Sequence, residues 1–553
     1  MSRRHRNNLR IKEQATATPE PDAAAHMWIL FGVIACFVLS GFAALLYQTA
    51  WMRQFSVVFG TSELAVATVL STYMAGLALG AAIAGRVIHR ITRPVLTYGL
   101  LEAAIATSAL AVPFLLKLAN SLYVGVLGGQ SAPPDASGLG QSFFYILVAF
   151  IVLVIPTGCM GATLPMLTKY VVRSERQIGP RVGLLYAVNT VGAVAGTVVA
   201  GFFLLPALGL SGTVWVGVAV NGLVFLIAAA LSRFVQSSGM SEASEAEAGP
   251  EHSTPVQPGS FRWIGPGWIL PLMLLSGANT FAYEVLWTRL LGHILGGSIA
   301  AFSTMLASFL GGIAIGSAIA ARLATDRVRA FNGFVVAQCG IALTSIIIYQ
   351  VMHLLIPEDA GLADNALLAI AILLPATLFV GATFPFAVRI LAESQADAAP
   401  SSARVYAWNT MGAIVGAVVA GYILIPLFRY EGAIQLAVMI NTALALVASL
   451  VILRRRYRTA AAAALLVAIV AFVYRPTVPE EILLRSPLID GRDNGEIRYY
   501  EVGRSATVLL MEEDGFFNLR TNGLPEASAN LTGAPPYQHN QRMLSMLPVI
   551  ARP

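Results

Sequence analysis

The sequence predicts an all-α polytopic membrane bundle of two parallel six-helix repeats, followed by a small β-rich C-terminal segment. Of its 553 residues, 57% are hydrophobic and only 12% are charged, whereas soluble globular domains carry about 25% charged residues. Apolar runs near the length of a membrane span recur along the chain, and motifs of the first half return in the second. This composition excludes a disordered, collagen-like or disulfide-rich secreted chain.

The hydrophobic residues gather in twelve long segments, which follow a basic N-terminal tail (1–27) that we expect to be disordered. Each segment must be helical, because backbone groups in hydrocarbon can only be satisfied within the segment itself. The expected spans are 28–50, 64–85, 95–118, 143–168, 183–205, 211–232, 268–290, 300–321, 331–355, 366–388, 405–426 and 430–453.

The distribution of Lys and Arg agrees with this number of spans. With the N-terminus in the cytoplasm, the segments on the cytoplasmic side hold 23 basic residues and the loops on the other side hold 4. Cytoplasmic loops of membrane proteins are enriched in Lys and Arg, so this ratio predicts a multi-pass protein of a bacterial inner membrane with a cytoplasmic N-terminus. The basic residues form no separate domain, so we expect the lipid bilayer and not nucleic acid as the partner.

An internal duplication is the most informative feature of the sequence. Leu39-Ser40-Gly41 recurs as Leu275-Ser276-Gly277 at an offset of 236, and Gly161-Ala-Thr-Leu-Pro165 recurs as Gly381-Ala-Thr-Phe-Pro385 at an offset of 220. The chain therefore divides into a first repeat (28–232), an acidic Ser/Pro-rich linker (233–267) and a second repeat (268–453).

Because six is an even number, both repeats enter the membrane from the same side. Parallel repeats related by an axis along the membrane normal are the pattern of major-facilitator-type transporters. Both repeats carry glycines four residues apart, as in Gly76/Gly80 and Gly192/Gly196. Small residues at that spacing let two helices approach closely, so we expect these glycines at helix contacts.

Ionisable residues at membrane depth are costly and are therefore candidate functional residues. Glu102 lies in the third span and Glu284 in the seventh, the latter beside Tyr283. The repeated Tyr, Trp and Arg positions around Tyr47 and Tyr283 are typical of an aromatic interface belt with a snorkelling Arg. Alternatively, Glu102, Glu284 and these tyrosines form a central pocket for a small cation such as a polyamine.

Two asparagines are repeated with the motifs, Asn189 and Asn409. Either they form hydrogen bonds between helices or they line a path for a substrate. The three cysteines all fall in apolar segments, and the sequence has no zinc-type spacing, so we expect neither a disulfide framework nor a metal site.

After the second repeat, residues 454–475 form a basic anchor and a short apolar stretch. The fifteen apolar residues 459–473 would extend about 22 Å as a helix. This is short of a ~30 Å hydrocarbon core, so the stretch is either a thin thirteenth span or an interfacial helix. Residues 476–553 predict three strands (497–502, 506–511 and 516–521) and a helix (537–550), with turns at Glu512–Gly515 and Asn522-Gly523.

Several of these motifs resemble a known family of bacterial membrane proteins, in which a transporter-like bundle is fused to a spermidine-synthase-like domain. The resemblance rests on Leu39–Arg53, Met74–Gly80 and Gly161–Pro165 and, beyond the membrane, on Tyr499–Val508, Leu519–Ser528 and Gln541–Pro548. The family implies a small β-rich segment that leads into a methyltransferase-like α/β domain, which binds decarboxylated S-adenosylmethionine and a diamine. Gln541 corresponds to a substrate-contact position of that domain. The sequence ends at Pro553, before the expected adenosyl-binding strand, so no catalytic residue and no cofactor is expected in this chain itself.

These observations leave hypotheses from different classes. The resemblance implies aminopropyl transfer to a diamine, in polyamine biosynthesis. The bundle itself fits a transporter or channel for a cationic or small organic solute, without catalytic activity. A membrane partner with no turnover of its own is the third.

Overall fold

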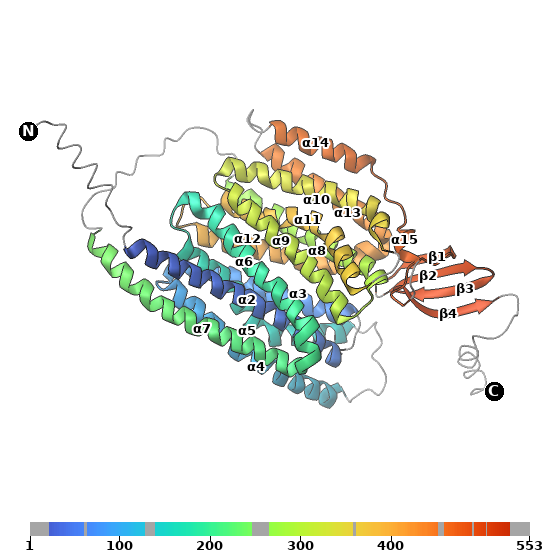
Figure 1. Cartoon of the computed structure of the whole chain (residues 1–553), viewed down its shortest axis with the longest axis horizontal. Helices are drawn as coiled ribbons and strands as arrows, with labels where there is room; N and C mark the ends of the chain where they lie inside the picture. The colour runs from blue at the N-terminus through green and yellow to red at the C-terminus, as the bar shows by residue number, and fades with distance from the viewer. Residues whose placement is uncertain are drawn as a thin grey trace, which may run out of the picture.

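The computed structural model describes residues 21–59, 63–127, 139–245, 265–357, 361–451, 458–488, 492–504 and 506–530. In these residues a bundle of long helices is followed by a small antiparallel sheet, which lies at one end of the bundle (Figure 1). The predicted substrate-contact residue Gln541 and the predicted helix 537–550 lie outside the described residues.

Ten of the described helical segments are long and apolar enough to cross a membrane. Two of them, Glu175–Phe234 and Ala398–Leu450, have 60 and 53 residues, which is far more than the roughly 20 needed for one crossing. Each contains one residue with non-helical backbone angles, Gly209 (φ 65°) and Arg429 (φ 54°), where the helix direction changes. Each long segment therefore supplies two passes, which gives the twelve that the sequence predicts.

The helices of the first half are α2 (Pro21–Phe59), α3 (Glu63–Val87), α4 (Pro94–Leu127), α5 (Leu139–Val171), α6 (Ile178–Val199) and α7 (Leu205–Glu245). Those of the second half are α8 (Ile269–Leu295), α9 (Ile299–Leu323), α10 (Arg327–Leu355), α11 (Leu362–Leu391), α12 (Ala398–Val419) and α13 (Ile425–Val451). Short 3₁₀ turns lie at Ile88–Arg90, Glu175–Gln177 and Pro266–Trp268.

Two predicted boundaries are wrong. α2 begins at Pro21, inside the tail that the sequence predicts to be disordered up to residue 27, and α7 continues to Glu245, inside the expected linker. A proline is well tolerated in the first turn of a helix, where its missing N–H would have no intrahelical partner. Residues 237–245 contain no proline, and α7 continues through Gly239.

Each half contains one π-helical turn at an equivalent place, Ala200–Leu204 before α7 and Ala420–Leu424 before α13. The two turns are followed by the repeat-related prolines Pro206 and Pro426. Proline cannot donate the backbone hydrogen bond of a regular α-helix, so the neighbouring turn changes its pattern.

The duplication seen in the sequence is repeated in the packing. α2 packs against α6 as α8 packs against α12, and α3 packs against α5 as α9 packs against α11. The repeated glycines lie at these contacts: a Cβ on Gly80 would overlap the carbonyl of Gly158, and a Cβ on Gly316 would overlap the carbonyl of Leu378. The prediction that these glycines allow close helix contacts is therefore confirmed.

The apolar stretch after the bundle forms α14 (Arg458–Val473), which packs along α13 and α10. Its Ala464 joins a core layer near the start of α8, and Tyr474, directly after it, accepts a hydrogen bond from Gln435 near the start of α13. α8 and α13 run in opposite directions, so the start of α8 and the start of α13 lie at opposite ends of the bundle. α14 therefore runs along the bundle from one end toward the other (Figure 1). This direction is the one that a thin thirteenth span would have, and the choice between a thin span and an interfacial helix stays a prediction.

Beyond α14, a single helical turn, α15 (Glu480–Leu483), leads into four strands rather than the three expected: β1 (Glu496–Val502), β2 (Thr507–Glu513), β3 (Phe516–Thr521) and β4 (Leu524–Asn530). They pair antiparallel in the order β1-β2-β3-β4. Both predicted turns are confirmed, because Asp514-Gly515 and Asn522-Gly523 have the positive φ angles of tight hairpins. The missed strand contains Pro525, which argues against a strand except at a sheet edge, and β4 is an edge.

Candidate functional site

The two halves of the bundle are packed together differently at its two ends. At the end where α2 and α8 begin, one continuous apolar core joins both halves, with Leu167 and Ile178 from the first and Ala320 and Phe331 from the second. At the other end each half has a core of its own. The contacts between the halves come mainly from α6 with α9 and from α3 with α12, which are repeat-related pairs.

Aromatic side chains lie where the halves meet in the middle of the bundle. Tyr186 of α6 stacks on Phe384 of α11, with ring centroids 4.6 Å apart, and Phe384 meets Tyr406 of α12 edge-on at 6.2 Å. Tyr186 packs against the separate core of the second half and Tyr406 against that of the first. Each of these repeat-related tyrosines therefore reaches across to the other half, at the inner limit of the shared core.

The end with the shared core is closed by polar contacts between loops that carry basic residues. The Gln395 amide in the α11–α12 loop donates to the carbonyl of Val172 in the α5–α6 loop, at 3.4 Å. Glu175 lies close enough to Arg389 of the other half for electrostatic attraction.

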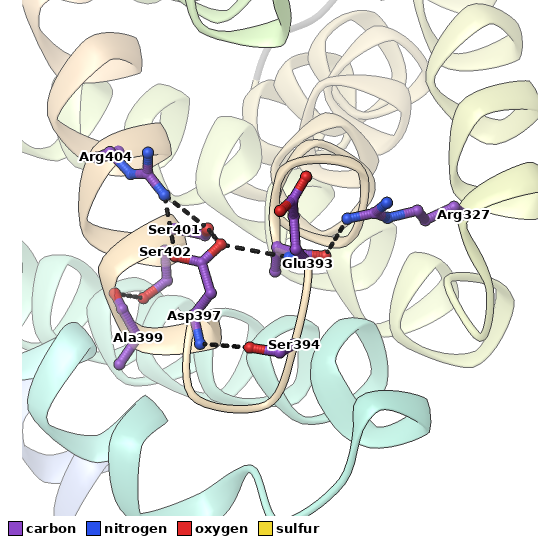
Figure 2. Close-up of polar contacts among 9 residues, drawn as sticks. Arg327, Glu393, Ser394, Asp397, Ala399, Ser401, Ser402 and Arg404 are labelled. Atoms are coloured by element: carbon purple, nitrogen blue, oxygen red, sulfur yellow. Dashed lines mark hydrogen bonds and ion pairs between the residues drawn. The ribbon is translucent and has the colours of Figure 1, made fainter. Parts of the chain in front are cut away.

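The α11–α12 loop is itself held by Asp397 (Figure 2). Its carboxylate pairs with Arg404 at 3.0 Å and accepts hydrogen bonds from the Ser401 hydroxyl and the Glu393 amide, at 2.8 and 3.3 Å. Arg327 of α10 donates to the carbonyl of Ala392 at 2.8 Å. These bonds fix the loop in the position from which Gln395 reaches the first half.

At the opposite end, the sheet is attached to the second half. Arg289, near the end of α8, donates to the carbonyls of Gly503 and Arg504 at 3.1 and 2.5 Å. Arg429 pairs with Glu501 at 3.1 Å, and the hydroxyls of Tyr430 and Thr507 are 2.7 Å apart. Apolar residues of β1 and β2 complete the core of that half.

Inside the sheet, Arg520 is the main buried charge, with a side chain 4% exposed. It pairs with Asp493 and also donates to the carbonyl of Leu484 at 3.2 Å. Burial lowers the pKa of the Arg520 guanidinium. A hydrogen bond with Asp493 raises the pKa of the Glu513 carboxyl above its usual value of 4.5.

Glu102 lies fully buried on α4, between α2 and α7. The Asn221 side-chain amide of α7 donates to its Oε2, and the hydroxyls of Ser40 and Tyr98 are next to the carboxyl. No Lys, Arg or His is among the groups that the described structure places around it. Among the described residues, the carboxyl has one hydrogen bond, from Asn221, and two neighbouring hydroxyls, but no ion pair that would offset the cost of burying a charge.

The equivalent position in the second half holds Gln338, and the surroundings are equivalent too. The Asn441 amide donates to Gln338 Oε1 at 2.6 Å, and Gln338 Nε2 donates to Ser276 Oγ at 2.9 Å. The Ser–Glu–Asn cluster (Ser40, Glu102 and Asn221) and the Ser–Gln–Asn cluster (Ser276, Gln338 and Asn441) thus occupy the same three helix positions of each half. Ser40 and Asn221 are partners of Glu102, and Asn441 is a partner of Gln338. The offsets of the internal repeat relate these positions to one another, whereas the hydrophobic periodicity of a single helix gives no sign of them.

Glu284 lies on α8 and is not brought together with Glu102. Its side chain is partly exposed, and no hydrogen bond or ion pair joins it to another described residue. It follows Gly277, which contacts Asn409, by two helical turns on the same helix face, so it points toward the interior of the bundle. The position equivalent to Glu284 in the first half is the buried Gln48.

The repeated tyrosines and tryptophans do not form an interface belt. Tyr47 and Trp51 are fully buried, with their rings stacked at 5.1 Å, and Tyr283 and Trp287 are 3% and 2% exposed. They fill the separate core of each half, so the interpretation as an aromatic belt is wrong. The spacing of Tyr and Trp places both on one face of the helix, and the sequence alone does not show whether that face meets lipid or a neighbouring helix.

The repeated asparagines lie at helix contacts. Asn189 faces Gly41 and Asn409 faces Gly277, and in each case a Cβ on the glycine would overlap the asparagine backbone. Both side chains are partly exposed. Within the described residues, no group of three His, Cys, Asp or Glu side chains could hold a metal ion.

One groove, of about 380 Å³, lies between α8, α12 and α13. It is lined almost entirely by apolar side chains, among them Leu272, Leu275 and Val447, with Asn279 as its polar member. The candidate polar residues Glu102 and Glu284 do not line it.

The chain matches no protein-family model and no curated protein. It is similar to two solved structures of a bacterial homologue of the iron transporter ferroportin. Both are in the outward-facing state, and the first contains soaked iron. The first is 11% identical, covers 78% of this chain and 98% of that chain and has a TM-score of 0.48. The second is 13% identical, covers 78% of this chain and 99% of that chain and has a TM-score of 0.46. The resemblance to the spermidine-synthase-like family has no support among these matches.

Proposed function

We propose that the protein is a membrane transporter that moves a small organic cation by exposing a site between its two halves to one side of the membrane at a time. The observation that carries this proposal is the unequal packing of the halves, with one shared core at the end with the basic loops and separate cores at the other. The halves also touch at the other end, where Gly201 of the first half meets Ser303 of α9. The shared core is the more extensive contact, and two rigid bodies can rock about it. Parallel repeats with this property are the basis of alternating access.

In this arrangement the central aromatic residues Tyr186, Phe384 and Tyr406 separate the closed end from the end with separate cores. The loop contact of Gln395 with Val172 and the attraction between Glu175 and Arg389 stabilise the closed end. By the distribution of basic residues, the end with the shared core is the cytoplasmic end in this proposal.

A small organic cation is the solute class that Glu284 favours. A partly exposed carboxylate without a partner in the interior of a membrane bundle is a default binding site for positive charge. A single carboxylate fits an ammonium group, which needs one negative partner to balance its charge. A transition metal ion would instead need several ligands.

Aminopropyl transfer is less well supported than transport. The described C-terminal part is an antiparallel sheet of four strands. It fits the small β-rich segment that the resemblance places before its adenosyl-binding α/β domain, so the sheet itself argues neither for nor against that activity. The sheet lies at the end of the bundle opposite the basic loops. By the same distribution of charge this end is outside the cytoplasm, away from the cellular pool of decarboxylated S-adenosylmethionine.

The proposal is tested with the purified protein in liposomes, using radiolabelled spermidine, putrescine and choline as probes. We expect uptake of at least one of them, and we expect Glu284→Gln to abolish it, because the amide cannot balance the charge of the solute. Glu480→Gln, which changes a carboxylate of α15 outside the bundle, is the matched control and should leave uptake unchanged. Absence of uptake for all three cations, or full uptake by Glu284→Gln, would contradict the proposal.

A further inference from the structure

The two repeat-related clusters around Glu102 and Gln338 differ at one atom that bears on protonation. A carboxyl and a primary amide have the same shape, but an ionised carboxylate can only accept hydrogen bonds, whereas the amide nitrogen donates two. Comparing the hydrogen bonds of the two clusters therefore shows whether Glu102 has a donor at the place where Gln338 has its amide nitrogen.

In the second half, both the oxygen and the nitrogen of the Gln338 amide form a hydrogen bond. Gln338 Oε1 accepts from Asn441 at 2.6 Å, and Gln338 Nε2 donates to Ser276 Oγ at 2.9 Å. In the first half, Glu102 Oε2 accepts from Asn221, as Gln338 Oε1 does from Asn441. This leaves Glu102 Oε1 in the place of the donating nitrogen, and within the described structure it is buried with no well-formed hydrogen bond.

A proton on Oε1 would give Glu102 the same hydrogen-bonding pattern as Gln338. The protonated oxygen could donate to Ser40, as Gln338 Nε2 donates to Ser276, and the buried group would then be neutral. The titratable groups around it are Cys36 and Tyr47 of α2, Tyr98 of α4 and Cys159 of α5, none of which is cationic. A carboxylate buried without a positive partner is far more costly than a neutral acid.

We propose that Glu102 is a proton-binding site, holds its proton on Oε1 in this conformation, and releases and rebinds it during the transport cycle. On release, the O–H bond of the carboxylic acid breaks, the electron pair stays on the carboxylate and the proton passes to water. Rebinding is the reverse, so no other reactant is required. The coupling of this step to solute movement rests on the proposed function. The presence of a proton on Glu102 does not depend on that function.

The proton itself is tested by infrared difference spectroscopy of the purified full-length chain, exchanged between H₂O and D₂O. We expect a carbonyl band of a protonated carboxylic acid at neutral pH that is lost in Glu102→Gln. Gln occupies the equivalent place in the second half, so this variant should fold with an unchanged melting temperature. Gln338→Glu is the matched control and should add a second such band. The absence of a band that depends on Glu102 would overturn the proposal.

The coupling is tested in liposomes with a pH-sensitive dye inside, by adding the cation that the uptake experiment identifies. Wild-type protein should change the internal pH as the cation enters, and a pH gradient should drive its accumulation. Glu102→Gln should lose both effects and still exchange internal for external cation. Cation uptake by wild-type protein without any pH change, or proton-coupled uptake by Glu102→Gln, would overturn the coupling while leaving the transport function intact.

Discussion

The ring of Tyr186 lies on the ring of Phe384 at a centroid distance of 4.6 Å, and this stack joins the first half of the bundle to the second. Phe384 is 3% exposed and also contacts Tyr406, so it is shared between both repeat-related tyrosines. The equivalent residue in the first half is Leu164, which has no ring. The centre of the bundle is therefore less symmetric than the repeat, although the helices around it are equivalent.

We expect Phe384→Ala to weaken the contact between the halves. Removing a buried Phe costs about 3–5 kcal/mol in protein cores, and here the loss falls at the junction that separates the two ends. The variant should therefore show a lower thermal unfolding midpoint. In liposomes it should also let cations leak across the bilayer when no cation is present on the other side to exchange for them. Leu164→Ala, also buried, is the control: it should lower the midpoint without the leak. Equal leaks in both variants would show that the stack does not seal the centre.

The repeated glycines make a second prediction about stability. Gly80→Val should destabilise the bundle by about 1–3 kcal/mol or more, because the new side chain would force apart the backbones of α3 and α5. Gly222 is also inside a helix, but a Cβ there meets nothing within 4 Å. Gly222→Ala should therefore be neutral or slightly stabilising, since Ala has the higher helix propensity. Thermal unfolding of the purified variants in detergent measures both effects, and a stable Gly80→Val would contradict the close contact.

Much of this architecture can be predicted from the sequence because the repeat supplies each observation twice. The offsets of 236 and 220 residues pair Gly80 with Gly316 and Tyr186 with Tyr406 directly from the order of residues in the chain. Hydropathy and basic residues then fix the number of passes and their common direction. The break at Arg429 is not predictable in this way, since only glycine and a few polar residues adopt a positive φ readily.

The candidate site is less predictable, because its residues meet through tertiary contacts. The buried cluster of Glu102 joins Ser40 and Asn221 from helices far apart in sequence. The same apolar pattern that marks a span does not show which side faces lipid and which faces another helix, so the pattern predicts an interface belt for Tyr47, which lies in a core. The roles proposed for Glu284, Asn189 and Asn409 stay predictions.

The position of the sheet makes a prediction about topology. Leu488, next to the sheet and 71% exposed, lies at the end opposite the basic loops, while His89 lies exposed in the basic α3–α4 loop. In spheroplasts, a membrane-impermeant maleimide should label Leu488→Cys at once and His89→Cys only after permeabilisation. The three native cysteines lie in apolar helices, and the unmodified chain gives the background. Labelling of His89→Cys alone in intact spheroplasts would reverse the proposed orientation.

The attachment of the sheet should depend on Arg289. Its guanidinium donates to two carbonyls of the β1–β2 turn, and Arg289→Ala would leave both acceptors without this charged donor. A hydrogen bond to a charged group contributes about 1.5–3 kcal/mol, so backbone amides of β1 and β2 should exchange with deuterium faster in the variant. Arg498→Ala is the control, because Arg498 pairs only within the sheet, with Glu496 and Glu512. The same exchange in both variants would show that the apolar contacts alone hold the sheet.

The sheet should also respond to pH through Glu513. Its pKa is raised because it shares a hydrogen bond with Asp493, so the folded sheet binds a proton more readily than the unfolded chain does. The associated stabilisation is present at low pH and is lost as the pH rises through the raised pKa. Glu513→Gln keeps a neutral hydrogen-bonding group and does not lose it.

The ratio of deuterium exchange rates of β2 and β3 in the two forms, taken at the same pH, measures this difference because the intrinsic exchange rate cancels. We expect the ratio to be near one below the usual Glu pKa of 4.5 and to show slower exchange in Glu513→Gln at neutral pH. Asp493→Asn behaves differently: it removes the charged partner of buried Arg520 and should destabilise the sheet by about 3 kcal/mol at neutral pH. A ratio that stays near one at neutral pH would show that Glu513 and Asp493 do not share a proton.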